Sequence, residues 1–251
     1  MNNIYETEKL LSEYLLFHYG FAEDFFTGGI KAKGVRDALH FPERSVNGLL
    51  DFPPAPDEAR ALDVGCAVGR ASFELARHCG SVTGIDFSSG FIGAARVLAQ
   101  VGELAFERLE EGARTSPCMA RVPQGIVRER VAFETGDAMA LREDLGAFDI
   151  VLAANLLCRL PDPAKFLARL PGLVKAGGQL AITTPCTWLE EFTPREKWLC
   201  DDNSTTLDGL HRYLDGTFDL VKQVDLPMII REHARKFQWT VALGTLWRRK
   251  E

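Results

Sequence analysis

The clearest chemical pattern in this chain is Ala61-Leu-Asp-Val-Gly-Cys-Ala-Val-Gly-Arg70, followed by Val82-Thr-Gly-Ile-Asp86. A short apolar run reaches Asp63, breaks at two glycines and opens into a helix-like segment, and the next apolar run ends in another acid, Asp86. An acid at the second position suits a ligand that contains a ribose, because one carboxylate can accept hydrogen bonds from both ribose hydroxyls.

The glycine spacing argues against two common phosphate-binding loops. A dinucleotide fold needs G-x-G-x-x-G, whose middle glycine lets the backbone approach a pyrophosphate, whereas Cys66 and Ala67 follow Gly65 here, and the next glycine is Gly69. A Walker loop needs Gly-Lys-Ser/Thr, and Gly69 precedes Arg70. We therefore predict S-adenosyl-L-methionine (SAM) as the ligand, since its adenosine bears an amino acid instead of phosphates; an ordinary strand-to-helix turn is the alternative.

Strand and helix patterns alternate around this motif, which predicts an α/β fold with right-handed crossovers. Two β-rich runs near the end have no helix between them and are expected to be antiparallel neighbours. The sequence therefore predicts a seven-stranded, mostly parallel sheet with one antiparallel strand. The expected strands are 61–65, 81–86, 130–134, 148–153, 179–183, 217–230 and 237–247, and the expected helices are 70–79, 88–101, 162–171 and 206–214.

The regions outside this alternation predict two additions. Residues 1–55 are expected to form an N-terminal helical extension, with helices at 4–20 and about 35–50, a break at Gly28-Gly29 and a stiff Pro53-Pro54-Ala55-Pro56 linker. Residues 56–251 then form the catalytic domain, with an insertion at about 102–128 beside the ligand face. Because such extensions often cover the cofactor pocket, we expect residues 1–55 to act as a lid; a core-packing helix is the alternative.

Ligands in an open α/β sheet bind outside the carboxyl ends of the strands, which selects further cofactor residues. Asp137, followed by Ala138, suits the adenine amino group, although a turn aspartate has the same sequence signature. Phe87 and Met139 are expected to pack on the adenine faces, with core packing as the alternative. Cys66, at the centre of the loop, is expected to be a small apolar filler rather than a reactive thiol.

The methyl-accepting side is predicted from polar and aromatic residues at the same edge. Asn155 ends the fourth strand of the alternation and is expected to meet the acceptor, with a helix cap as the alternative. The segment after the fifth strand contains Trp188 and Glu190 and is expected to wall the acceptor pocket. Tyr14 on the N-terminal helix can hold a cationic ring by cation–π attraction.

Composition bounds the class of protein. The chain has 251 residues, 46% of them apolar, and a formal net charge of −6, which predicts a sizeable core and argues against a nucleic-acid partner, since such proteins usually carry a basic face. The six cysteines form no C-x-x-C pair and the five histidines lack metal-ligand spacing, so we expect free thiols, no metal and a cytoplasmic location. We expect no membrane segment and no signal peptide.

Beyond the loop, several segments resemble a narrower family. The glycine loop with the run to Phe87 looks like a Rossmann-like class I SAM-dependent methyltransferase, and the chain is similar to the C-terminal methyltransferase domain of ovothiol synthases over nearly its whole length. The segments that carry this similarity are Tyr5-Glu-Thr-Glu-Lys-Leu-Leu-Ser-Glu-Tyr-Leu-Leu-Phe-His-Tyr-Gly20, Leu152-Ala-Ala-Asn-Leu156, Thr187-Trp-Leu-Glu-Glu-Phe192, Glu196-Lys-Trp198 and Ile230-Arg-Glu-His-Ala-Arg-Lys-Phe-Gln238.

The resemblance implies methyl transfer to an imidazole nitrogen of 5-thiohistidine (4-mercaptohistidine), the final step of ovothiol biosynthesis. The chain has no room for the iron-dependent half of the bifunctional synthases, so a separate iron-dependent sulfoxide synthase is expected upstream. The acceptor carboxylate or thiolate would be held by Arg231, Arg235 and Lys236. His18 or Tyr19 is the expected proton acceptor, with Asn155 orienting the ring. The alternatives are another small amino acid or amine as acceptor, or a non-catalytic SAM-binding module.

Overall fold

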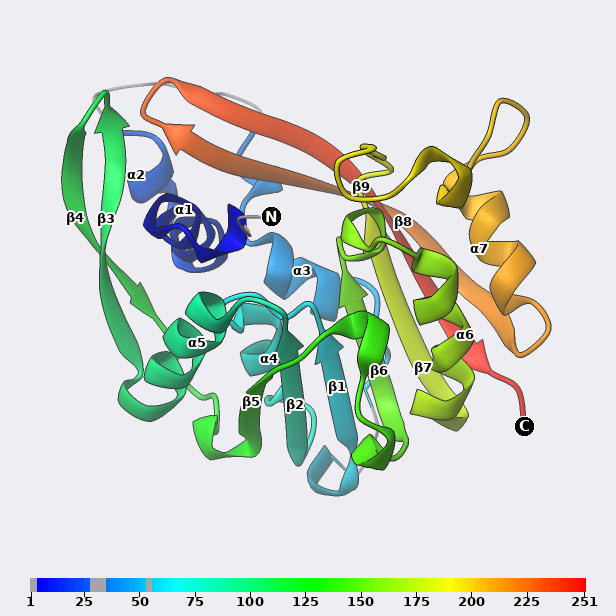
Figure 1. The fold of residues 1–251 in the computed structure, drawn as a ribbon. Coiled ribbons are helices and arrows are strands. Elements are labelled where there is room, and N and C mark those ends of the chain that lie inside the picture. The colour runs from blue at the N-terminus through cyan, green and yellow to red at the C-terminus, as the bar shows by residue number, and fades with distance from the viewer. Residues whose placement is uncertain (1–3, 28–34, 53–55) are drawn as a thin grey trace.

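A seven-stranded sheet forms the centre of the computed structural model, which describes residues 4–27, 35–52 and 56–251 (Figure 1). Its strand order is β5-β2-β1-β6-β7-β9-β8, and β9 alone runs against the others. This order and direction confirm the predicted α/β class. The strands are β1 Arg60–Val64, β2 Ser81–Asp86, β5 Val131–Thr135, β6 Phe148–Ala154, β7 Val174–Thr184, β8 Phe218–His233 and β9 Lys236–Arg249.

Helices cover both faces of this sheet because its central strands are buried on both sides. Alternate residues of one strand enter different cores: Ala61 packs with α1, α3, α4 and α5, whereas Leu62 packs with α6 and α7. This two-residue alternation is the side-chain period of a strand. The helices are α1 Glu8–Tyr19, α2 Ala22–Phe25, α3 Phe41–Asn47, α4 Arg70–Leu75, α5 Ser89–Val101, α6 Pro163–Leu173 and α7 Thr206–Leu214.

The helix expected at about 35–50 is shorter than predicted. A 3-10 turn, Arg36–Ala38, comes first, and α3 begins only at Phe41 with Pro42 in its first turn. Proline is tolerated there because the N–H groups of the first turn have no acceptor within the helix, so the N–H that proline lacks is not needed. The break at Gly28-Gly29 and residues 53–55 of the expected linker lie outside the described residues.

The expected insertion is a β-hairpin, which the sequence prediction did not assign. Its strands, β3 Glu103–Glu111 and β4 Arg114–Arg121, pair antiparallel and turn at Gly112, whose φ is 59°. The hairpin tip meets the outer end of β8, where the Ala234 N–H donates to the Glu110 carbonyl over 3.0 Å. In Figure 1, α1 lies beside both of these ribbons, and it contacts β3 and β8.

The β8–β9 connection corrects one sequence expectation. The connection expected between the predicted strands 217–230 and 237–247 is largely strand, and Arg231 within it is buried in an ion pair with Glu110 (Nη2–Oε2 2.7 Å). Arg231 Nη1 also donates to the Leu109 carbonyl over 2.6 Å. Because breaking a buried pair leaves an uncompensated charge, we assign Arg231 to joining β8 to the hairpin instead of to binding the acceptor.

Candidate functional site

The loop after β1 folds over the end of β2 in a left-handed conformation. Gly65, Ala67 and Gly69 have φ values of 77°, 48° and 84°. The N–H groups of Gly65 and Cys66 both donate to the Ile85 carbonyl, over 2.8 and 3.1 Å. A Cβ atom on Gly69 would lie 2.5 Å from the Phe133 ring, so this position needs glycine for both space and backbone conformation.

Asp86 lies at the end of β2 and holds this loop in place. Its Oδ2 accepts the Ala67 N–H over 2.8 Å and its Oδ1 accepts the Ser88 N–H over 2.9 Å. Ser88, and not Asp86, caps α5, because the Ser88 hydroxyl accepts the Phe91 N–H over 3.1 Å. Each carboxylate oxygen therefore keeps a lone pair for one ribose hydroxyl.

Asp63 and Cys66 lie beneath the loop, away from solvent. The Ser72 hydroxyl donates to Asp63 Oδ2 over 2.6 Å, and burial raises the pKa of Asp63 to about 7. Burial also raises the pKa of the Cys66 thiol, so this cysteine is a poor nucleophile, as its filler role predicts.

The residues that the sequence predicts to contact adenine lie next to Asp86. The Gly136 N–H donates to the Asp86 backbone carbonyl over 2.9 Å, which brings Asp137 and the buried Ala138 to the same edge. Asp137 is exposed, and its Oδ1 accepts the Met139 N–H of its own turn over 2.8 Å. The Phe87 side chain is 64% exposed, which leaves an aromatic surface beside the Asp86 carboxylate. These features fit an adenosine, whose ring would bury that surface.

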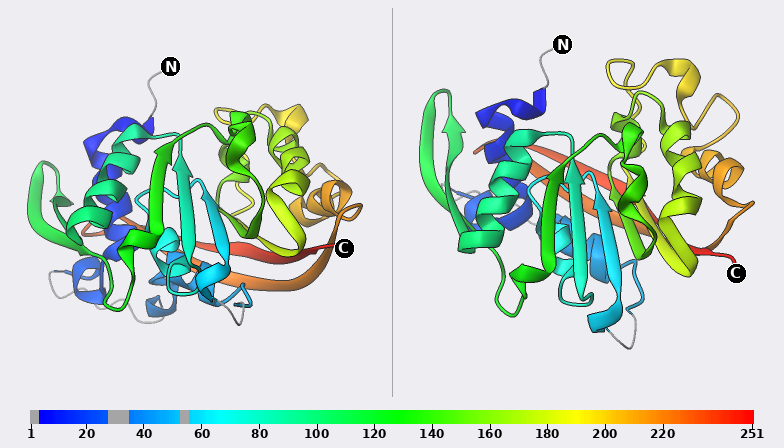
Figure 2. Two further views of the ribbon diagram at one scale, coloured as in Figure 1. Left: turned by 90° about the horizontal axis from the view of Figure 1, so that it is seen from below. Right: turned by 60° about the horizontal axis from the view of Figure 1, so that its bottom comes forward.

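The N-terminal segment is fastened to this edge at two points, and Figure 2 shows it beside the start of α5. The Ser88 hydroxyl donates to the Tyr5 carbonyl over 3.0 Å, and Glu6 Oε1 accepts the Ser89 N–H over 2.8 Å. At the other end of α1, the Tyr19 hydroxyl donates to the Val68 carbonyl of the glycine loop over 2.8 Å. The role of this segment as a lid stays a prediction, and Glu6 is a contact that helical periodicity alone did not reveal.

His18 and Tyr19, the proton acceptors expected from the sequence, and Tyr14 beside them on α1 are all poor proton acceptors. Burial lowers the pKa of His18 to about 3, and Arg70 acts in the same direction. Burial raises the pKa of Tyr14 and of Tyr19, so both phenols stay protonated at neutral pH. The buried His18 Nδ1 has no hydrogen-bond partner in the described part of the chain, which makes it an open polar position near the glycine loop.

Asn155 ends β6 at the same edge and joins three strands. Its φ is 53°, and its N–H donates to the Thr183 carbonyl over 2.9 Å. The side-chain Oδ1 accepts the Thr183 hydroxyl over 3.0 Å, and Nδ2 lies 3.1 Å from the Met228 sulfur. A thioether is a weak acceptor, so this amide group keeps donor capacity for a ligand.

The other predicted acceptor residues divide into buried and exposed ones. Trp188 is 8% exposed, and its Nε1 donates to the Thr206 hydroxyl over 2.9 Å, which anchors the segment after β7 to α7. Glu190 and Arg235 are exposed, and Lys236 pairs with Glu232 over 2.7 Å at the end of the β8–β9 ribbon. The structure therefore does not gather Arg231, Arg235 and Lys236 around one open anion site.

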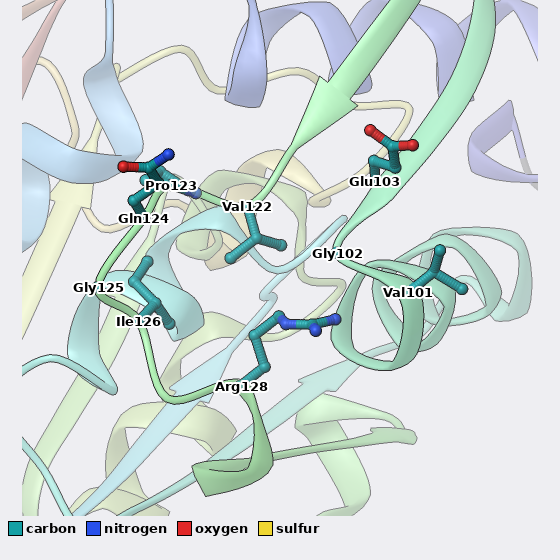
Figure 3. A pocket seen from close by; sticks show the side chains of 9 residues that line it. All are labelled: Val101, Gly102, Glu103, Val122, Pro123, Gln124, Gly125, Ile126 and Arg128. Carbon is teal, nitrogen blue, oxygen red and sulfur yellow. The ribbon is translucent and has the colours of Figure 1, made fainter.

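A separate pocket lies at the far end of α5 (Figure 3). Arg128 lines it and donates to the Ala99 carbonyl over 2.9 Å, which satisfies the end of the helix. Since α5 starts at Ser89 and ends at Val101, a rise of 1.5 Å per residue puts this pocket roughly 18 Å from the Asp86 end. It is not part of the cofactor edge. Its lining residues are Val101, Gly102, Glu103, Val122, Pro123, Gln124, Gly125, Ile126 and Arg128.

Comparison with known proteins bears on this geometry. Residues 62–182 match the family model described as a methyltransferase domain. Residues 62–182 of this chain are therefore similar to a methyltransferase domain. A ubiquinone biosynthesis O-methyltransferase from Coxiella burnetii is 29% identical over 123 residues, which is 49% of this chain and 42% of that protein. The chain thus spans less than half the length of the curated relatives it matches.

Solved structures agree on the fold. The magnesium protoporphyrin IX methyltransferase from Synechocystis, solved with bound SAM, is similar with a TM-score of 0.51 and 17% identity, covering 99% of this chain and 100% of that one. A SAM-dependent methyltransferase from Methanosarcina mazei gives a TM-score of 0.52 and 20% identity, covering 80% and 99%. At these identities the similarity concerns the fold alone.

Residues 4–27, 35–52 and 56–251 contain neither a candidate metal site nor a candidate membrane-spanning helix. In these ranges, the histidine, cysteine, aspartate and glutamate side chains form no group of three that could hold a metal ion. Their helices also include none with the length and apolar character needed to cross a membrane.

Asp86→Asn is expected to weaken SAM binding by the methyltransferase domain by about tenfold to hundredfold. The amide has one acceptor oxygen where the carboxylate has two, so its NH2 group would face a backbone N–H, and charge-assisted hydrogen bonds are lost. Calorimetric titration with S-adenosyl-L-homocysteine measures the change. Asp201→Asn is the control and should leave the affinity unchanged, because Asp201 is exposed, accepts the Asn203 N–H of its own turn over 2.8 Å and is not a predicted cofactor residue; equal losses for the two variants would contradict the ribose assignment.

Asp63→Asn is expected to change how stability depends on pH. The pKa of Asp63 is about 7 in the folded chain and about 3.9 when unfolded, so the native state binds this proton more tightly. Its contribution is present at low pH and is lost as pH rises from about 4 to 7, by up to about 1.4 kcal/mol per pH unit. Urea unfolding should show a smaller decline with pH in Asp63→Asn.

His18→Gln is the matched control for this measurement, because its effect has the opposite sign. The pKa of His18 is lowered to about 3 in the folded chain and is about 6.5 when unfolded, so the unfolded state binds this proton more tightly. The contribution of His18 to stability therefore increases as pH rises between these two values. The His18 variant should therefore lose stability more steeply as pH rises. The same change of slope in both variants would show that the raised pKa of Asp63 does not cause the pH dependence.

Proposed function

We propose that this protein transfers a methyl group from SAM to an imidazole ring nitrogen of 5-thiohistidine. The observation that supports this acceptor is the convergence of three segments that resemble thiohistidine methyltransferases. The N-terminal segment reaches the glycine loop through Tyr19, and the end of β6 reaches β8 through Asn155 and Met228. The segment after β7 reaches the turn after β6 through Phe192, whose ring centre lies 4.4 Å from the Arg159 Cζ.

Methyl transfer to a ring nitrogen depends mainly on how SAM and the acceptor are positioned. SAM supplies a sulfonium methyl group, which passes to the lone pair of the ring nitrogen and leaves neutral S-adenosyl-L-homocysteine, and the ring then releases one proton. Free imidazole is already largely neutral near pH 7, given a pKa of roughly 6.5. The low pKa of His18 and the raised pKa values of Tyr14 and Tyr19 agree with a site that lacks a strong base among these residues.

Asn155 is the residue we assign to orienting the acceptor ring. Its side chain is held by Thr183 and Met228, so the amide is fixed before a ligand arrives. Fixed positioning can contribute on the order of 7–11 kcal/mol to lowering a barrier, whereas a general base typically contributes about 10²–10⁴-fold in rate. In this proposal a separate iron-dependent sulfoxide synthase makes the acceptor.

A second candidate is methyl transfer to an oxygen of a small aromatic molecule. The curated relatives named as ubiquinone biosynthesis O-methyltransferases favour it. An O-methyltransferase must remove a hydroxyl proton from its acceptor, and none of His18, Tyr14 and Tyr19 is well suited to accept it. We therefore rank the imidazole acceptor first.

An acceptor panel tests the proposal. We expect the purified protein to release S-adenosyl-L-homocysteine with 5-thiohistidine at a kcat/KM at least tenfold above that with histidine, other amino acids and amines, or catechols. The reason is that the Asn155 amide, held by Thr183 and Met228, would position this ring for transfer. Methylation of a catechol but not of thiohistidine would favour the second candidate, and tight SAM binding without turnover on any acceptor would favour a non-catalytic module.

A further inference from the structure

Arg159 follows β6 near the cofactor loop, and no sequence pattern selected it. It ends the 3-10 turn Leu157–Arg159, directly after β6 and Asn155, and its N–H donates to the Leu156 carbonyl over 2.8 Å. The Leu156 side chain packs against Gly65, where an added Cβ would lie 3.0 Å from it. The sheet order reverses between β1 and β6, and ligands of open α/β sheets bind in the crevice at such a point.

The Arg159 guanidinium has no carboxylate partner in the described part of the chain. Its Cζ lies 4.4 Å from the centre of the Phe192 ring, and none of its side-chain N–H groups has a hydrogen-bond or ion-pair partner there. In contrast, the buried Arg70 and Arg231 each pair with a glutamate at 2.7–2.8 Å. This cation–π contact uses no N–H group of the guanidinium as a hydrogen-bond donor to a carboxylate, so these groups are free for a ligand.

The partly buried Arg159 side chain faces the aromatic residues that the lid brings to the site. Burial raises the pKa of Tyr5 and of Tyr14, Arg159 opposes this shift at both phenols, and Asp86 adds to it. The Tyr5 and Tyr14 rings pack edge to face with centroids 6.3 Å apart. Arg159 and the ribose-binding Asp86 are therefore in electrostatic range of the same two rings, on the acceptor side and the cofactor side of the crevice.

We propose that Arg159 binds the carboxylate of the methyl acceptor and makes the enzyme select amino acids over the corresponding amines. The inference rests on the proposed function, because it takes the acceptor to bind above the end of β6. A guanidinium held over an aromatic ring can bind a carboxylate through two parallel N–H bonds. This is the role that the sequence suggested for Arg231, which Glu110 already occupies.

Two acid–amine pairs test this role: 5-thiohistidine with its decarboxylated amine, and histidine with histamine. Binding is measured by calorimetry with S-adenosyl-L-homocysteine present, and turnover is measured with SAM. The wild-type protein should bind the acid of each pair more tightly. In Arg159→Met, KM and Kd for the acid should rise about tenfold to hundredfold, with kcat within a few-fold and the amine unaffected.

Three controls separate this role from a structural one. Arg159→Lys should restore part of the preference for the acid, since it returns the charge without the two-bond grip. Arg195→Met removes another arginine stacked on an aromatic ring, with its Cζ 5.9 Å from the centre of the Trp198 ring, and should leave the preference unchanged. The affinity for S-adenosyl-L-homocysteine should match the wild-type value in every variant.

The outcomes distinguish the two proposals. Preferential binding of the acids that depends on Arg159, without methylation of either ring, would support Arg159 and overturn the imidazole activity. Methylation of thiohistidine with equal affinity for acid and amine, or an equal loss for both in Arg159→Met, would overturn the role of Arg159 and leave the activity standing. Binding of neither member of either pair would overturn both.

Discussion

The hydrogen bond from the Ala67 N–H to the Asp86 carboxylate is the contact on which the site depends. A non-glycine residue in the left-handed region costs roughly 1–2 kcal/mol, and Ala67 has a φ of 48°. A hydrogen bond to a charged acceptor contributes about 1.5–3 kcal/mol, so the 2.8 Å contact to Asp86 offsets that strain. The same carboxylate thereby shapes the loop and keeps lone pairs that we propose bind the ribose.

In the site we propose, the two ends of the chain and the segment after β7 form the acceptor side around this fixed edge. The N-terminal segment is held by backbone and side-chain contacts at Ser88 and Val68. The β8–β9 ribbon is tied to the β3–β4 hairpin through Arg231 and Glu110, so that α1 contacts both. A buried ion pair is a weak source of stability but can specify one arrangement, which is the role we assign to this pair.

The sequence predicted what depends on local pattern and on order along the chain. The strands from Ala61 to Asp86, the antiparallel last strand and the position of Asp86 follow from apolar runs and their spacing, and all are confirmed. The hairpin at 103–121 was missed because charged residues interrupt its alternation and Pro117 lies within β4. Roles set by distant partners were also missed. Glu110 precedes its ion-pair partner Arg231 by 121 residues. In the described part of the chain, Arg159 lacks a carboxylate partner because of how the fold places it, which local sequence does not show.

The most direct measurement of this account is a crystal structure of the protein with S-adenosyl-L-homocysteine and 5-thiohistidine. The account predicts both ribose hydroxyls within hydrogen-bond distance of the Asp86 carboxylate, with the acceptor ring beside Asn155 and its reacting nitrogen facing the homocysteine sulfur. A ribose bound elsewhere would contradict the role of Asp86. An acceptor that occupies the crevice without contacting Asn155 would contradict the proposed acceptor site.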